Sequence, residues 1–459
     1  MQERKQTVLD DNRILKLLLK LSTPATIGMI VMALYNIVDT IFVGHWVGAR
    51  GIAGIAIVFP FQMLMLATGN MLGIGGASMI SRSLGSKDYD RADTTLGNTI
   101  SVAVFLGIII ALLGNSFLHQ ILQAFGSTET IFPYAREYMS VILLGSLFFI
   151  FMVSSNNIIR SEGRAKIAMG TMLISALINI ILDPIFIYVL DLGVEGAAIA
   201  TVISQAATTV YIIYYFTSGR SSLKLTLTHF IPHAKILKEQ ISIGISGFFR
   251  QAAGSLLVII INNSIAHYGS DLALAAFGII HRLLRFTLMP IFGIAQGMQP
   301  IVGFNYGARK IGNALKAIRL SVLAATLVAT LGFTIMFFFP HLLLRIFTND
   351  VELIELGQRA LKLMFLALPI VGIHIIGSTT FLALGKALPA LLLSISRQII
   401  VLIPLVLILP RFYHLDGIWI AFPISDIFTA CVTSILLYHL FLKLKKIKKA
   451  QSQINLNSD

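Results

Sequence analysis

Two acidic residues lie inside long apolar stretches of the sequence, and each has an asparagine on the same helical face. Asp39 follows Asn36 by three residues, and Asp183 follows Asn179 by four. Residues at these spacings project from one side of an α-helix. An ionised carboxylate at membrane depth is costly and is usually retained for a proton, an ion or a cationic substrate. The pattern therefore indicates a membrane transporter.

The composition agrees with a membrane location for these residues. Of the 459 residues, 56% are hydrophobic and only 12% are charged, whereas about a quarter of the residues of a soluble protein are charged. The mean hydropathy is +0.85. The first apolar run, from about Ile14 to Val43, is too long for a cleavable signal peptide, and the single Cys431 cannot form an internal disulfide. We therefore expect an all-α polytopic protein of the cytoplasmic (inner) membrane.

Twelve apolar segments are long enough to cross a bilayer, which takes roughly 20 residues each. In the first half of the chain we expect transmembrane helices at 15–44, 52–80, 94–118, 131–157, 164–190 and 194–217. In the second half we expect them at 237–268, 271–299, 312–340, 354–383, 386–410 and 414–442. Because the number of spans is even, both termini lie on the same side.

Lysine and arginine residues identify that side. They cluster in alternate loops and at both ends of the chain, whereas the opposite loops contain only Arg50, Arg345 and Arg411. Positive charge marks cytoplasmic loops, so we expect both termini in the cytoplasm. The same distribution argues against a nucleic-acid partner in spite of the net charge of +14. We expect the lysine-rich end of the chain to meet anionic lipid head groups.

The two halves of the sequence repeat each other. Gly85 and Gly307 end similar motifs, and Gly163 and Gly385 start similar loops, both at an offset of 222 residues (307 − 85 and 385 − 163). A repeat with six helices per half predicts two lobes of the same orientation, with the substrate bound near the membrane midplane. We expect an N-terminal six-helix lobe at 1–217, a cytoplasmic linker at 218–236, a C-terminal six-helix lobe at 237–442 and a basic cytoplasmic tail at 443–459.

Four motifs carry a resemblance to a known family. Pro24 precedes Leu-Tyr-Asn-Ile-Val-Asp (34–39), and Ile-Ser-Arg-Ser-Leu-Gly-Ser-Lys-Asp (80–88) follows the second expected helix. Arg-Ser-Glu-Gly (160–163) follows the fourth, and Asn-Ile-Ile-Leu-Asp-Pro-Ile-Phe-Ile (179–187) lies in the fifth. In this order and spacing they resemble the multidrug and toxic compound extrusion (MATE) family, above all its archaeal and DNA-damage-inducible-F-like branch.

The resemblance implies a V-shaped transporter with two lobes that exports amphipathic, often cationic small molecules in exchange for H⁺ or Na⁺. It implies that the coupling ion binds at Asp39, Asn179, Asp183 and Thr201, and that Asn36 and Asn156 line the same cavity. No cofactor or metal is expected beyond the coupling ion. The partners expected are the substrate and membrane lipids, and the chain is expected to act as a monomer.

The chemistry of the N-lobe residues agrees with this expectation and leaves the ion open. Asp, Asn and Thr supply oxygen ligands, which suit a hard cation such as Na⁺. Two neighbouring buried carboxylates can equally share a proton. Pro24 frees a backbone carbonyl and creates a bend point, so we hypothesise that the first helix bends with the charge state of Asp39. The alternative is that these polar residues only bond to neighbouring helices.

The second half has mostly positive intramembrane charges. These are Arg250, Arg282, Arg285 and Arg397, with Asp426 as the one counterion. We expect Asp426 to pair with Arg282 or Arg397. A sharper alternative is that the arginines meet an anionic part of the substrate or a lipid head group. His281 or His374 as a proton relay is a further alternative.

Two other functions compete with the antiporter. A flippase for a lipid-linked or anionic precursor would use the same design of two lobes; the C-lobe arginines favour it and the acidic N-lobe pair opposes it. An intramembrane enzyme would need a metal-ligand cluster, a protease motif or a nucleotide loop, and the sequence has none of these. We therefore expect a transporter and no enzyme.

Overall fold

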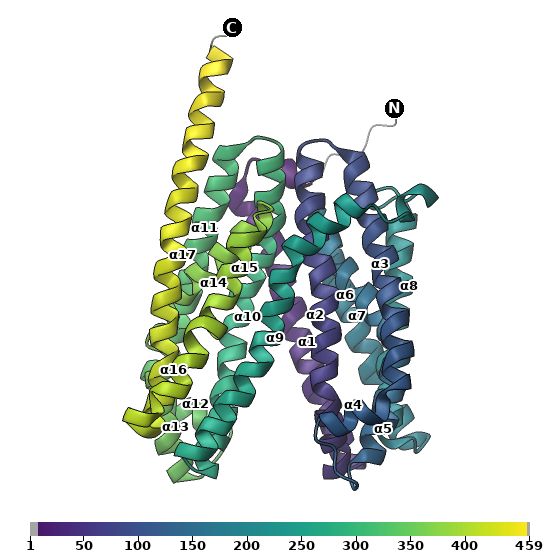
Figure 1. The fold of residues 1–459 in the computed structure, drawn as a ribbon, viewed down its shortest axis with the longest axis vertical. Helices are drawn as coiled ribbons and strands as arrows, with labels where there is room; N and C mark the ends of the chain where they lie inside the picture. Colours follow the sequence, from purple (N-terminus) through teal and green to yellow (C-terminus); the bar gives the residue numbers. More distant parts are fainter. Residues whose placement is uncertain (1–7, 457–459) are drawn as a thin grey trace. The chain divides into compact units, whose positions relative to one another are not determined.

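Long helices follow the apolar segments of the chain (Figure 1). The computed structural model describes residues 8–456 and contains no strand among them. The elements of the first half are η1 (Val8–Asp10), α1 (Ile14–Trp46), α2 (Ala49–Gly85), α3 (Tyr89–Ser116), α4 (Leu118–Ala124), α5 (Phe132–Leu144), α6 (Ser146–Ser161), α7 (Ala165–Pro184), η2 (Ile185–Val189), α8 (Gly193–Thr217) and η3 (Leu227–Phe230). Those of the second half are α9 (Ala234–Tyr268), α10 (Asp271–Gly307), α11 (Ile311–Phe338), α12 (Pro340–Arg345), α13 (Val351–Met364), α14 (Leu368–Ala383), α15 (Ala387–Ile395), η4 (Ser396–Leu402), α16 (Ile403–Ile408) and α17 (Pro410–Leu456).

The prediction of twelve membrane spans is confirmed when two bent helix pairs each count as one span. Among the described residues, ten helices are long and apolar enough to cross a membrane, and the pairs α5–α6 and α13–α14 bend by 57° and 52°. Gly145 separates α5 from α6 at a close approach to Val202, where a Cβ would overlap the valine side chain. Pro369 lies in the first turn of α14, where a proline is tolerated because its missing N–H is not needed, and it cannot continue a helix from α13.

The described residues divide into two compact units that share two helices. The first unit comprises Val8–Asp10 and Ile27–Phe248, and the second comprises Asp11–Thr26 and Phe249–Leu456. Helix α1 therefore begins in the second unit and ends in the first, whereas α9 begins in the first and ends in the second. This division differs from the predicted boundaries at 217 and 237, which assign each of these helices to one lobe.

Small residues explain where the first part of each shared helix packs. In the second unit, α1 approaches α10 so closely that a Cβ on Gly293 would overlap Thr26. In the first unit, α9 approaches α2 so closely that a Cβ on Gly244 would overlap the backbone oxygen of Met71. Close contact of helix backbones through small residues is a common packing mode in membranes. Ile27 and Phe249 are the first residues after the two boundaries, and they are 249 − 27 = 222 residues apart. The two helices therefore pass from one unit to the other at equivalent positions of the sequence repeat.

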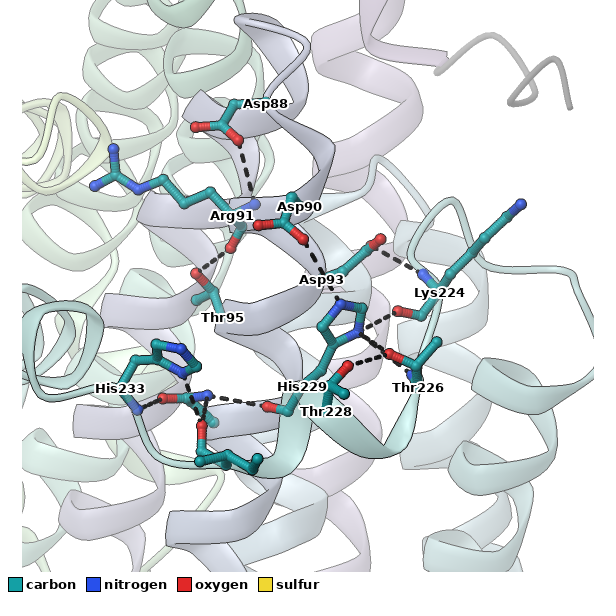
Figure 2. Close-up of polar contacts among 12 residues, drawn as sticks. Asp88, Asp90, Arg91, Asp93, Thr95, Lys224, Thr226, Thr228, His229 and His233 are labelled. Carbon is teal, nitrogen blue, oxygen red and sulfur yellow. Dashed lines mark hydrogen bonds and ion pairs between the residues drawn. The ribbon is translucent and has the colours of Figure 1, made fainter. Parts of the chain in front are cut away.

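The segment predicted as the linker is bound to the first unit along α3 (Figure 2). The backbone N–H of Lys224 donates to Asp93 at 2.9 Å. The side chain of Asn98 donates to the carbonyls of His229 and Ile231, both at 3.0 Å, and accepts from the N–H of His233 at 2.6 Å. The linker is therefore fixed to α3 through its own backbone.

A fully buried acid, Glu162, binds the start of the same segment. It lies between α6 and α7 and accepts hydrogen bonds from the Ser221 hydroxyl at 2.7 Å, the Ser222 N–H at 2.6 Å and the Tyr215 hydroxyl at 3.3 Å. Burial raises the pKa of Glu162 from 4.5 to about 7, although these hydrogen bonds act in the opposite direction. The carboxyl group thus changes its charge near neutral pH.

Candidate functional site

Four of the predicted site residues meet inside the first unit. Asp39 comes from α1, Asn179 and Asp183 from α7, and Thr201 from α8. The side-chain N–H₂ of Asn179 donates to Asp183 at 3.1 Å and lies 3.4 Å from the hydroxyl of Thr201. Asn179 and Asp183 share a face of α7 because they are four residues apart. Pro184 follows directly, and the helix continues as the π-helical turn η2, a local feature that often accompanies functional sites.

The two acids lie against each other. The carboxyl groups of Asp39 and Asp183 are within hydrogen-bonding distance. An ionised carboxylate has acceptors only, so a hydrogen bond between two carboxyl groups requires one proton. Two carboxyl groups this close can share one proton.

The cluster also contains oxygen atoms that no described residue satisfies. Asp39 Oδ1, Asp183 Oδ2 and Asn179 Oδ1 are buried and have no hydrogen-bond partner among the described residues, which do not include the side chain of Asn36. Buried acceptors without a donor are rare in proteins. Three acceptors at one place, two of them on carboxyl groups, fit a proton or a hard cation with oxygen ligands.

Comparison with known proteins identifies the family. A profile of the MatE family matches residues 24–185 and 248–408, which is more than half of the chain. The chain belongs to the MATE family.

Its relatives span the same length. The multidrug export protein MepA of Staphylococcus haemolyticus (strain JCSC1435) is 28% identical over 440 residues, which cover 96% of this chain and 97% of MepA. A solved structure of the MATE multidrug transporter DinF-BH, in complex with a small molecule, is 43% identical, with a TM-score of 0.89, and covers 96% of this chain and 98% of its own. A multidrug resistance MATE transporter in an outward-facing conformation is 27% identical, with a TM-score of 0.90, and covers 98% of this chain and all of its own. The MATE proteins are transporters, and this chain is a multi-pass membrane transporter and not an enzyme.

The other residues predicted for the N-lobe of this MATE protein lie in different surroundings. Asn156 on α6 is buried and donates to the Ala168 carbonyl at 2.8 Å and the Thr171 hydroxyl at 2.7 Å. These bonds connect α6 to α7 rather than to Asp39. Pro24 lies within the continuous helix α1. The side chain of Asn36 lies outside the described part of the structure.

Sequence reasoning missed two tyrosines beside the acids. Tyr35 and Tyr138 both lie close enough to Asp39 and Asp183 to interact with them electrostatically. Tyr138 also accepts a hydrogen bond from Gln62 at 3.1 Å. Tyr35 is one helical turn before Asp39, so its position on the same face of α1 was available from the sequence. Tyr138 comes from the distant helix α5 and was not.

The charged residues predicted for the C-lobe lie in different surroundings in the second unit. Of the two partners expected for Asp426, Arg397 makes the contact, with Nε 2.5 Å from Asp426 Oδ1. Arg282 is exposed on α10. His281 stacks on Phe277 with ring centroids 5.7 Å apart, and His374 is buried with Nδ1 3.2 Å from the hydroxyl of Thr433.

Proposed function

We propose that this protein is a secondary antiporter that exports amphipathic, often cationic compounds in exchange for H⁺ or Na⁺ at the cluster of Asp39, Asn179, Asp183 and Thr201. The observation that supports it most is the proximity of the Asp39 and Asp183 carboxyl groups, beside three buried oxygens that accept no hydrogen bond from a described residue. The multidrug names of the relatives support the substrate class. The lysine and arginine distribution supports cytoplasmic termini in the inner membrane, and the protein acts as a monomer among membrane lipids.

The exchange follows from the charge of the cluster. A proton or Na⁺ that arrives from outside neutralises the carboxylates and removes their attraction for a cationic compound, which then leaves. Release of the ion toward the cytoplasm restores the negative charge, and the next compound binds. In this proposal α1 bends at Pro24 when Asp39 changes charge, because the ring of a proline removes one helical hydrogen bond.

Efflux from proteoliposomes tests the proposal. The protein is reconstituted with ethidium, a fluorescent amphipathic cation, and efflux is followed under an imposed gradient of either pH or Na⁺. We expect Asp39→Asn and Asp183→Asn to abolish the response to the gradient that drives the wild type. Asp271→Asn, an exposed acid at the start of α10, is the matched control and should retain it. Full gradient-driven efflux by Asp39→Asn would refute the proposed site.

The competing function is a flippase for a lipid-linked or anionic precursor. The surplus of arginines in the second unit favours it, whereas the paired carboxyl groups of the first unit oppose it. The same vesicles distinguish the two, because a flippase would move a fluorescent anionic lipid between leaflets and leave ethidium inside.

A further inference from the structure

The second unit contains a cluster with more positive than negative charge. Arg397 on η4 and Asp426 on α17 form an ion pair whose side chains are 18% and 6% exposed. Arg250 on α9 is partly buried. Arg250 is one helical turn before Gly254, where a Cβ would lie 3.6 Å from the side chain of Gln398, the neighbour of Arg397. Both arginines also act electrostatically on the buried imidazole of His374, so we treat the four side chains as one cluster. With a neutral histidine its charge is 2 − 1 = +1.

Several N–H donors of the two arginines in this cluster have no hydrogen-bond acceptor among the described residues. Among the described residues, Arg397 donates only through Nε, to Asp426, and its two terminal NH₂ groups have no acceptor. Arg250 has no hydrogen bond or ion pair with any described residue. A guanidinium group has five N–H donors and no acceptor. The unsatisfied groups of this cluster are therefore positively charged hydrogen-bond donors. This is the opposite of the first unit, where the unsatisfied atoms of the acid cluster are acceptors.

A cavity lies against the ion pair within the second unit. Arg397 and Asp426 form its polar wall, and Phe365, Phe422 and Met364 are among its apolar lining residues. The one acidic group in this wall is already paired with Arg397. Arg397 belongs to a π-helical turn, Ser396–Leu402, and such turns frequently occur at functional sites.

We propose that this cavity binds a monovalent anion, with Arg397 as the hydrogen-bond donor and Arg250 as the second positive charge. One negative charge brings the cluster to neutrality (+1 − 1 = 0), and a buried charge is tolerated when it is paired and hydrogen-bonded. The anion is either a free halide ion or the carboxylate end of an amphipathic compound. The site is independent of the proposed exchange at Asp39 and Asp183, since all of its residues lie in the second unit.

Anion-dependent thermal stability of the purified full-length protein tests the proposal. A ligand that binds the folded state raises the melting temperature as its concentration rises. In one arm, chloride replaces gluconate at constant sodium and ionic strength. In the other, benzoate is compared with the neutral benzamide. A saturable rise with chloride identifies a halide site, and a saturable rise with benzoate alone identifies a carboxylate site.

Variants separate an anion site from an ion pair that only holds helices together. Arg397→Gln alone leaves Asp426 buried without a partner, so the double variant Arg397→Gln/Asp426→Asn removes both charges. We expect it to bind the anion at least about tenfold more weakly, the effect of losing one charge-assisted hydrogen bond. Asp426→Asn alone should bind the anion more tightly, because the net charge of the cluster rises to +2.

The control is Arg359→Gln, since Arg359 pairs with Asp416 in the same unit but is exposed. It should leave the anion-dependent rise unchanged. The proposal is overturned if neither anion raises the melting temperature of the wild type. It is also overturned if the double variant retains the rise, or if Asp426→Asn weakens binding.

Discussion

The side-chain amide of Asn179 donates to Asp183 one helical turn away at 3.1 Å, and its own oxygen has no partner among the described residues. The amide therefore has two separate roles. Its N–H₂ group holds one carboxylate oxygen in place, and its oxygen adds a neutral acceptor to those of Asp39 and Asp183. In the proposed site a small cation would therefore meet several acceptors that no described residue satisfies, and the two carboxyl groups would supply the negative charge.

Asn179→Ala should lower gradient-driven ethidium efflux about tenfold or more. The substitution removes the donor that orients Asp183, and a hydrogen bond to a charged group contributes about 1.5–3 kcal/mol. Proteoliposome efflux under the driving gradient measures the loss. Asn115→Ala on α3, whose exposed amide only bonds to Ala111 of its own helix at 2.9 Å, is the matched control. Equal efflux by the two variants would contradict the role given to Asn179.

The sequence was sufficient to predict the helices and the shared helical face of Asn179 and Asp183. Apolar runs of membrane length and the repeat of 222 residues determine the spans, because a lipid environment leaves little alternative to helices. Asn179 and Asp183 are visible as a pair since helical periodicity alone places them on one face. The position of Asp39 beside this pair depends on tertiary packing. The cost of burying a charge suggests that Asp39 has a polar neighbour, but only the structure shows which one.

Other features depend on tertiary contacts that periodicity does not encode. Asp426 could have paired with Arg282 or Arg397, and the packing of η4 against α17 selects Arg397. The first part of α9 belongs to the first unit because Gly244 allows backbone contact with α2. A glycine in an apolar helix does not by itself reveal which helix it approaches.

Asn98→Ala should release the linker from α3. The change leaves the carbonyls of His229 and Ile231 and the N–H of His233 without the donor and acceptor that bind them. Ile231 and His233 are exposed, so their backbone groups can bond to water instead, and each lost hydrogen bond costs about 0.5–1.5 kcal/mol. We expect faster hydrogen exchange at residues 226–234, measured by mass spectrometry. Ser101→Ala, which removes one bond of 2.7 Å to Phe230, should have a smaller effect, and an equal effect would contradict the central role of Asn98.

The stability of the folded protein should depend on pH through Glu162. Its pKa is raised from 4.5 to about 7 in the folded protein by burial, so the protonated form of this group favours folding. This contribution is complete below the unfolded pKa and is lost as the pH rises through about 7. The equilibrium constant of unfolding should therefore increase about tenfold between pH 6 and pH 8. Unfolding by denaturant at the two pH values measures it.

Glu162→Gln is the variant that isolates this effect. Glutamine does not titrate, so the tenfold difference between the two pH values should disappear. Glu239→Gln, in the ion pairs of α9 with Arg82 and Arg91, removes a carboxylate from the same unit and should keep the pH dependence. A pH dependence that persists in Glu162→Gln would assign it to another group.

Because the first part of α1 packs in the second unit, two glycine-to-alanine substitutions on α10 should have different effects on stability. A Cβ on Gly293 would overlap Thr26 of α1, whereas a Cβ on Gly278 would meet nothing within 4 Å. We expect Gly293→Ala to destabilise the protein by about 1–3 kcal/mol, the usual cost of overpacking. Gly278→Ala should be neutral or stabilising by up to about 1 kcal/mol, because alanine favours helix. Melting temperatures in detergent measure both. The double variant Gly293→Ala/Thr26→Ala should recover part of the loss, since it removes the overlapping hydroxyl, and no recovery would mean that α1 does not pack at Gly293.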